Sequence, residues 1–404
     1  MLLRLAWKNI LHYRGRSITT FVLTLVSAYF FIVYVAFMDG AHASMLKNAL
    51  DVYTGSLQIY HKGYREEGGY DYLIEDTRKI CRILDRTEGL RAYSSRLETY
   101  GIASSKDRSS AIMLTGVNFA REARLSELKK ALLRGVYDSS GSCLYVGSGL
   151  AKKLQVDLGS ELSFVGSAVD YSFVAELFTV CGIFKTGMYD FDLQSAFMNR
   201  RSFDALFLSK NYSSYIVAMA KNIEGNDMVA GRISRELPPE LELYTWQRLM
   251  KSMVQLMRLD SLFGYISMGL FFLVIFFVIM IYGFINVSSR LKEFGILKSI
   301  GLSDGNIDLL LFYEILLLTL GALLFAVPLG AFTAWYFEIH PIVIPGMNET
   351  YREYGIVSDT VPTLFDPLTI VWNTVLISLL NLLSILYPMR YVRSFGPVEA
   401  MHHV

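Results

Sequence analysis

The sequence predicts a membrane α-helical protein with four transmembrane helices and a large α+β extracytoplasmic domain inserted between helices 1 and 2. The chain is 53% hydrophobic, with a mean hydropathy of +0.36. Runs 18–38, 261–287 and 368–389 contain no charged residue, and run 309–337 contains only Glu314. A helix of about 20 apolar residues crosses the hydrocarbon core, and backbone that faces lipid must be helical. Each run is therefore a predicted span.

Lys and Arg residues orient these spans. They gather in segment 1–17, in loop 288–308 and in the tail 390–404, whereas loop 338–367 holds a single base. Because Lys and Arg accumulate in loops that stay cytoplasmic, both termini and loop 288–308 are predicted to be cytoplasmic. Segments 39–260 and 338–367 then lie outside.

Run 18–38 is either a cleavable signal peptide or an uncleaved membrane anchor. Ala-His-Ala at 41–43 resembles a signal-peptide cleavage site, but run 18–38 is longer than a signal h-region of about 7–15 residues. An uncleaved anchor is the favoured interpretation.

The three cysteines, Cys81, Cys143 and Cys181, are odd in number and widely spaced, so we expect neither a disulfide framework nor a zinc site. They are read as small buried apolar residues, and no metal site is predicted.

Segment 39–260 mixes helical and strand periodicities without regular βαβ alternation, which favours an α+β domain. Its expected helices are 72–86, 120–134, 147–154, 201–208 and 226–237. Its expected strands are 54–60, 97–104, 111–117, 161–184 and 215–220. Residues 41–51 are expected to continue the first span outward, and 246–260 to lead without a break into the second. These two helices would form a stalk under the domain.

The opening segment, 1–17, predicts an amphipathic helix on the cytoplasmic membrane surface. Leucines and Ile10 provide apolar anchors, Trp7 and Tyr13 are aromatic residues of the kind found at the membrane interface, and the basic residues suit anionic headgroups.

Loop 288–308 carries the strongest functional signal. Residues 290–301 are long enough for a short helix, and Gly301 stands where such a helix would end. A simple charged connector is one interpretation. However, four apolar residues lie in a loop that should be wet, and they favour docking of the helix into a groove of a partner. They are Phe294, Ile296, Leu297 and Ile300.

Three motifs point to one family: Arg290-Leu-Lys-Glu293-Phe-Gly295-Ile-Leu-Lys298-Ser-Ile-Gly301, the ending Pro397-Val398-Glu399-Ala400, and the opening Ala6-Trp-Lys-Asn-Ile10. With the topology of one span, a large external domain and three further spans, they resemble the FtsX/MacB-like permeases of ABC transporters. The external stretches 145–162 and 182–190 are similar to the lipoprotein-releasing LolC/LolE-type permease subunits. The resemblance extends over essentially the whole chain.

The resemblance implies a non-catalytic subunit of an ATP-driven complex in the inner membrane of a Gram-negative envelope. A separate ATPase dimer would bind ATP and Mg and push segment 290–301 of two permease chains, a process called mechanotransmission. The sequence contains no G-x-x-x-x-G-K-[ST] phosphate loop, so this chain is expected to hold no cofactor and to be no enzyme by itself. The implied ATPase-coupling residues are Arg290, Glu293, Phe294, Gly295, Leu297, Lys298, Ile300 and Gly301, with the tail motif Pro397, Val398, Glu399 and Ala400.

The resemblance also implies external partners. These are a second permease chain (identical or different), an acylated lipoprotein that enters between the first and second spans, and a periplasmic lipoprotein chaperone. In the family a β-hairpin holds the chaperone, and the corresponding stretch here is 166–176, with Val169, Tyr171 and Phe173. An ordinary hairpin is the alternative interpretation of this stretch.

The alternatives to lipoprotein release are a related permease, a receptor and an enzyme. A related permease would drive peptide or drug efflux, or activate an envelope enzyme mechanically. A receptor would need a cytoplasmic signalling domain, and the cytoplasmic pieces are too short for one. The acids Asp190 and Asp192 lack a nucleophile or base partner in sequence, which argues against an enzyme.

Glu314, just inside the third span, is expected to pair with Lys or Arg of the coupling segment; substrate contact is the alternative.

Overall fold

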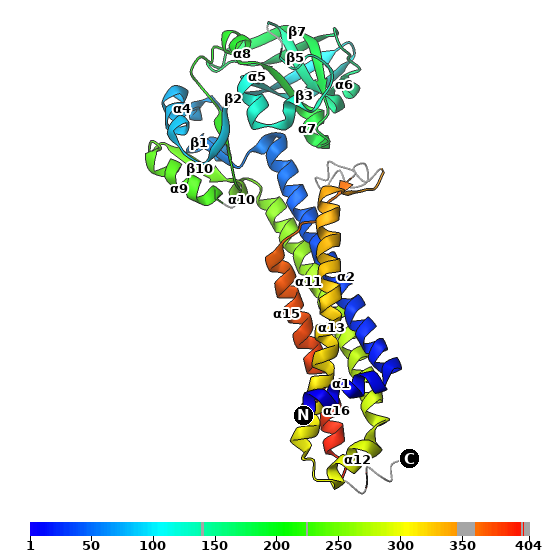
Figure 1. Ribbon diagram of the computed structural model, residues 1–404. Coiled ribbons are helices and arrows are strands. Elements are labelled where there is room, and N and C mark those ends of the chain that lie inside the picture. The colour runs from blue at the N-terminus through cyan, green and yellow to red at the C-terminus, as the bar shows by residue number, and fades with distance from the viewer. Residues whose placement is uncertain (139–140, 224, 346–359, 397–398, 400–404) are drawn as a thin grey trace. The chain divides into compact units, whose positions relative to one another are not determined.

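The structure is a computed structural model, and it divides the chain into two compact units (Figure 1). The residues that it describes are 1–138, 141–223, 225–345, 360–396 and 399. The helical unit comprises Met1–Ala43, Leu256–Val343 and Thr360–Val404. The α+β domain is built from Ser44–Gln255, with Ile344–Asp359 assigned to the same unit.

Long apolar helices and several shorter helices make up the helical unit. They are α1 (Leu2–His12), α2 (Arg14–Ala49), α11 (Lys251–Ser288), α12 (Leu291–Ser299), α13 (Asp304–Ile339), α15 (Pro367–Ser384) and α16 (Leu386–Arg393), with the short strands β11 (Ile342–Val343) and β12 (Thr360–Val361). Within the described residues, four helical stretches are long and apolar enough to cross a membrane: Arg14–Thr54, Lys251–Ser288, Asp304–Ile339 and Pro367–Arg393. Each contains one of the four predicted runs.

Three of these four stretches pack tightly together. Ala28 and Phe31 of α2, Leu323 of α13 and Ile377 of α15 share one core. In the most apolar window of each of these stretches 33% of the residues are buried, compared with 6% in α11. Within one chain, α11 thus buries fewer of its residues than the other three stretches, although Met268 and Phe272 pack against the shared core.

The α+β domain is made of short helices around one large sheet. Its helices are η1 (Leu50–Thr54), α3 (Tyr64–Glu67), η2 (Tyr70–Tyr72), α4 (Thr77–Arg86), α5 (Phe119–Leu125), η3 (Glu127–Lys129), α6 (Ser148–Leu154), α7 (Tyr189–Gln194), α8 (Arg200–Leu206), α9 (Asn226–Glu236) and α10 (Trp246–Leu249). Its strands are β1 (Leu57–His61), β2 (Leu90–Ser105), β3 (Arg108–Val117), β4 (Leu132–Gly135), β5 (Cys143–Gly147), β6 (Glu161–Ser167), β7 (Phe173–Phe184), β8 (Ser195–Asn199), β9 (Tyr215–Ala220) and β10 (Leu241–Thr245).

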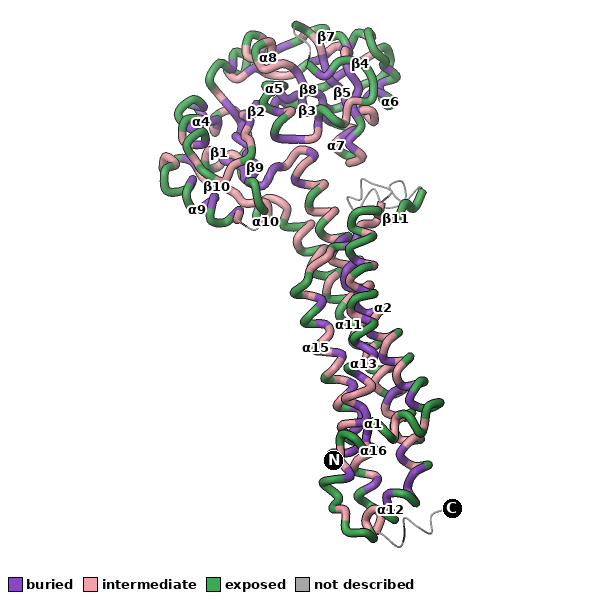
Figure 2. Tube along the Cα trace, in the orientation of Figure 1, coloured by how far each residue is buried: buried purple, intermediate pink, exposed green. Residues whose placement is uncertain are grey.

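The sheet has ten strands in the order β10-β1-β9-β2-β3-β8-β5-β7-β4, and β6 pairs with both β2 and β7. The pairing of β6 closes β2, β3, β8, β5, β7 and β6 into a ring. Leu97, Phe164 and Phe178 belong to the apolar core of this ring. A second core forms where α4 and α9 pack on β1 and β9, and the buried residues follow the central strands in Figure 2.

Strand β2 is shared by both parts of the domain. Its first half pairs with β9 and its second half with β3 and β6. At the changeover Arg96 is fully buried and donates to Glu122, which is also fully buried. Glu98 accepts hydrogen bonds from Tyr53, at 2.9 Å, and from Tyr215. Burial raises the pKa of Glu98, although both tyrosine hydroxyls and the Arg96 charge favour its carboxylate.

Three helix predictions need correction. Residues 120–134 form no continuous helix: α5 ends at Leu125, η3 follows, and Leu132–Gly135 is strand β4 because it pairs with β7. The helix expected over 246–260 is interrupted at Met250 (φ −111°, ψ 50°), between α10 and α11. The helix expected over 72–86 begins only at Thr77, because the Asp76 side chain accepts from Lys79 N and caps it.

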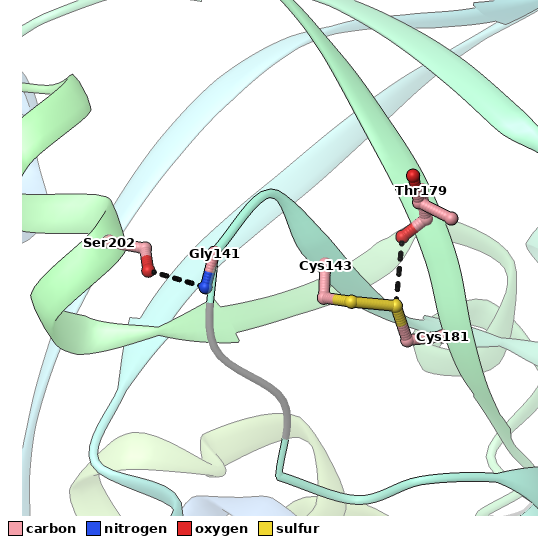
Figure 3. The surroundings of a disulfide bond; sticks show 5 residues. All are labelled: Gly141, Cys143, Thr179, Cys181 and Ser202. Atoms are coloured by element: carbon pink, nitrogen blue, oxygen red, sulfur yellow. Dashed lines mark hydrogen bonds between the residues drawn. A yellow bond between two sulfur atoms is a disulfide. The ribbon is translucent and has the colours of Figure 1, made fainter.

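The prediction that the cysteines form no disulfide is wrong. Cys143 on β5 and Cys181 on β7 are disulfide-bonded, with Cα atoms 5.5 Å apart (Figure 3). Their 38-residue separation looked too wide, but β5 and β7 are parallel neighbours that bring distant residues together. Beside the bond, Gly141 N donates to Ser202 Oγ at 3.2 Å. Cys81 is a free thiol, and burial raises its pKa.

Candidate coupling region

Helix α12 and the helix ends around it form the candidate functional site. The helix ends where the sequence predicted, because Gly301 adopts φ +98°, a backbone conformation that glycine reaches without steric cost. Gly301 N donates to Lys298 O at 3.0 Å, and Leu302 N to Leu297 O at 3.0 Å. These bonds satisfy carbonyl groups of the last turn and turn the chain toward α13.

The apolar residues of α12 fall on two opposite sides. Phe294 is 1% exposed, and Leu297 is partly buried in the same cluster with Val287, Ile307 and Val392. Both therefore pack against the chain's own helices, which corrects the expectation that they face a partner. The neighbouring Gly295 is buried as well.

Ile296 and Ile300 point the other way. Their side chains are 50% and 79% exposed, next to the exposed residues Lys292 and Glu293. The outer side of this segment is thus a small exposed apolar stripe of two isoleucines with charges beside it. The predicted set therefore separates into an inner, structural face and a small outer face.

Arg290 anchors the inner face through a buried ion pair. Its Nη1 lies 2.8 Å from Glu314 Oε2 and its Nη2 3.2 Å from Glu314 Oε1. The guanidinium carbon also lies 4.8 Å from the ring centre of Tyr13. Burial opposes the charge of Arg290, but Glu314 and Glu293 outweigh it and raise the pKa of Arg290. The expectation that Glu314 pairs with the coupling segment is confirmed.

The N-terminal helix joins this network, a contact that sequence reasoning missed. Asn9 Nδ2 donates to Glu314 Oε1 at 2.6 Å, the Tyr13 hydroxyl donates to Glu293, and Arg16 donates to Ser289. Segment 1–17 therefore packs against the rest of the helical unit and is not one helix: α1 ends at His12, and Arg14–Ser17 already belong to α2. The residues involved are about 300 positions apart, so no local pattern announces the contact.

Lys298 ties α12 to the end of the chain. Its Nζ donates to Val392 O at 3.1 Å and to Phe395 O at 2.8 Å, and lies 2.9 Å from Asp304 Oδ1. Of the predicted tail motif, Glu399 accepts from Gly396 N at 3.0 Å. Pro397, Val398 and Ala400 lie outside the described residues.

The external hairpin has the predicted form. β6 and β7 pair antiparallel around the turn, with Ser167 opposite Phe173. Tyr171 and Phe173 are 59% and 75% exposed, whereas Val169 packs against the core of the ring. Only two of the three predicted contact residues are thus available to a partner.

Asp192 has a structural role. It is buried and accepts from Thr186 N and Thr186 Oγ1, at 3.0 Å and 2.7 Å, so it fixes a turn.

One similarity to known proteins lies in the helical unit. Residues 265–397, about a third of the chain, match the family model described as FtsX-like permease C-terminal. The match includes α12, Arg290 and Glu314. None of the curated proteins matches the chain.

Three solved domains are similar to this chain at low identity. The extracellular domain of the noncanonical ABC-type transporter YknZ from Gram-positive bacteria is 12% identical, with a TM-score of 0.36 over 47% of this chain and 100% of that one. The periplasmic region of MacB from Actinobacillus actinomycetemcomitans is 10% identical (TM-score 0.37; 52% and 97%). A domain assigned to a permease protein from Porphyromonas gingivalis is 15% identical (TM-score 0.31; 48% and 91%). TM-scores this low carry no argument about the function of the chain.

Proposed function

We propose that the chain is the permease subunit of an ABC transporter, and that it transmits the ATP-driven motion of a separate ATPase to a periplasmic domain. The observation that carries the proposal is the two-sided α12 helix, which lies inside the matched permease segment. Its outer face, with Ile296 and Ile300, docks on the ATPase. That ATPase binds ATP and Mg, while this chain is non-catalytic and holds no cofactor.

The inner face of α12 explains how a push would spread. Arg290 connects α12 to Glu314 of α13, and Lys298 connects it to the backbone at the end of α16. Through Tyr13 and Glu293 it also holds α1, which precedes the first long helix. Because these contacts are buried or charge-assisted, α12 moves together with the helix ends around it rather than independently.

The cargo in this proposal is an acylated lipoprotein, released from the inner membrane for transfer to the outer membrane. An apolar cavity of about 290 Å³ lies between α2 and α11. Its lining is almost entirely apolar, which suits an acyl chain. The lining residues are Phe30, Phe31, Tyr34, Ser267, Met268 and Phe271.

The proposed assembly contains two permease chains. A second chain would cover the surface that α11 leaves open. Tyr171 and Phe173 of the hairpin are the proposed contact for a periplasmic chaperone. Both termini are cytoplasmic in this arrangement.

Depletion of the chain tests the cargo. After depletion, inner and outer membranes are separated and acylated lipoproteins quantified in each. Accumulation of outer-membrane lipoproteins in the inner membrane supports the proposal. Unchanged sorting after depletion, together with co-purification of the ATPase with the chain from undepleted cells, would instead favour efflux or mechanical activation of an envelope enzyme.

A further inference from the structure

The α+β domain contains a second concave site, far in sequence from the coupling region. It is a groove of about 310 Å³ between the end of α4, the start of β2 and the helix α5. Its polar lining includes Arg91, Arg121 and Arg124, together with Asp85 and Tyr93. Leu84 and Leu90 provide an apolar part.

The three arginines are only partly neutralised. Arg91 Nη2 lies 3.1 Å from Asp51 Oδ1 and 2.9 Å from Leu125 O, so this guanidinium is already engaged. Within the described part of the chain, Arg121 and Arg124 form no ion pair. The one acidic residue in the lining, Asp85, accepts the hydroxyl of Tyr93 instead.

Arg121 is held in place although it carries no ion pair. Its guanidinium carbon lies 4.9 Å from the ring centre of Tyr93, and its Nη1 lies 3.8 Å from Cys81 Sγ. A guanidinium that is stacked on an aromatic ring keeps its N–H groups free at the edge. Arg121 is therefore already oriented before a ligand arrives, which lowers the entropic cost of binding.

The groove holds three arginines and one carboxylate, and Arg121 and Arg124 have no ion-pair partner among the described residues, so its excess positive charge favours an anion. A guanidinium fork matches the oxygens of a phosphate group, and two forks match it better than one. We propose that this groove binds a phosphate-bearing ligand, with Arg121 and Arg124 on the phosphate and Tyr93 positioning Arg121. The proposal rests on the α+β domain alone and does not depend on the proposed transport function.

The test uses the full chain in dodecyl maltoside, a detergent without phosphate, titrated with inorganic pyrophosphate in a calorimeter at physiological ionic strength. Saturable binding is expected. Arg121→Gln and Arg124→Gln are each expected to weaken it about tenfold or more, because each removes a charge-assisted contact. Arg232→Gln, on the exposed surface of α9, is the matched control and should leave binding unchanged.

Cys81 supplies an independent readout, since it is the free thiol and touches Arg121. Pyrophosphate should slow its reaction with the uncharged reagent N-ethylmaleimide in the native chain and not in Arg124→Gln. Dihexanoyl phosphatidylglycerol then separates the sources of the phosphate. Competition with pyrophosphate identifies a lipid headgroup, and no competition identifies a soluble phosphate compound. No binding, or equal binding by all four proteins, would overturn the proposal.

Discussion

Arg290 and Glu314 form a buried, two-pronged ion pair between the start of α12 and the first turns of α13, with N–O distances of 2.8 Å and 3.2 Å. A buried pair costs desolvation energy, and its main effect appears when one partner is lost. The pair therefore holds the start of α12 against α13 within the helical unit.

Removing one member of this pair should be worse than removing both. Arg290→Gln alone is expected to destabilise the chain by about 3–5 kcal/mol, because the Glu314 carboxylate stays buried without a cation. Glu314→Gln should cost less, because Arg290 keeps Glu293, whose Oε2 lies 3.4 Å from its Nε. The double variant should recover part of this loss. Thermal unfolding of all four proteins in detergent, analysed as a double-mutant cycle, measures the coupling. Strict additivity of the two losses would show that the contact has no energetic role.

The outer face of α12 should matter for binding the ATPase and not for folding. Ile300→Asp is expected to change stability by no more than about 0.5 kcal/mol, since the side chain is 79% exposed. It should, however, abolish co-purification of the ATPase and its stimulation by the permease. Leu208→Asp, at an exposed site in the α+β domain, is the control. Normal ATPase binding by Ile300→Asp would contradict the docking surface.

A substitution on the inner face of α12 should instead destabilise the fold and affect ATPase coupling only through that loss. Phe294→Ala is expected to cost about 3–5 kcal/mol, because it leaves a cavity in the cluster with Leu291 and Val392. Loss of ATPase coupling in this variant should follow the loss of folded protein when the two are measured over a temperature series. Full stability with lost coupling would mean that Phe294 contacts the ATPase after all.

The Cys143–Cys181 disulfide predicts the compartment in which the α+β domain lies. Disulfides persist in oxidising compartments, so Cys143–Cys181 should be formed in cells only if the α+β domain lies outside the cytoplasm. Alkylation of whole cells before and after reduction counts the free thiols, with Cys81 as the internal reference. Cys143→Ser is expected to cost about 2–4 kcal/mol of stability under non-reducing conditions. A fully reduced pair in growing cells would place the domain on the other side.

Glu98 predicts how stability depends on pH. Its pKa is raised in the folded domain, mainly by burial, so the folded state binds its proton more tightly than the unfolded state. Its contribution to stability is therefore present below the unfolded pKa and is lost as pH rises through the folded pKa. Glu98→Gln should flatten this fall, whereas Glu161→Gln, at an exposed carboxylate, should not. Melting curves at a series of pH values, from about pH 4 (near the unfolded pKa of a glutamate) upward, compare the three proteins. Parallel curves would argue against the assignment.

What depends on local pattern could be predicted from the sequence. The four apolar runs lie within long helices, strand 215–220 is β9, and Gly301 ends α12. What depends on distant pairing could not. The disulfide follows from the parallel contact of β5 with β7, and the role of Asn9 and Tyr13 follows from packing of α1 near Glu314. Hydrophobicity alone also could not separate Phe294, which faces inward, from Ile300, which faces outward.

Strands β1 and β10 begin and end the domain, and they are direct neighbours, with Leu57 opposite Thr245. The chain thus enters and leaves the sheet at one place. Domains whose ends lie close together can be exchanged or enlarged without moving their attachment points. The pairing of β1 with β10 makes the α+β domain a replaceable module, so a chain of this design could acquire a different domain between α2 and α11 while α12 stayed unchanged.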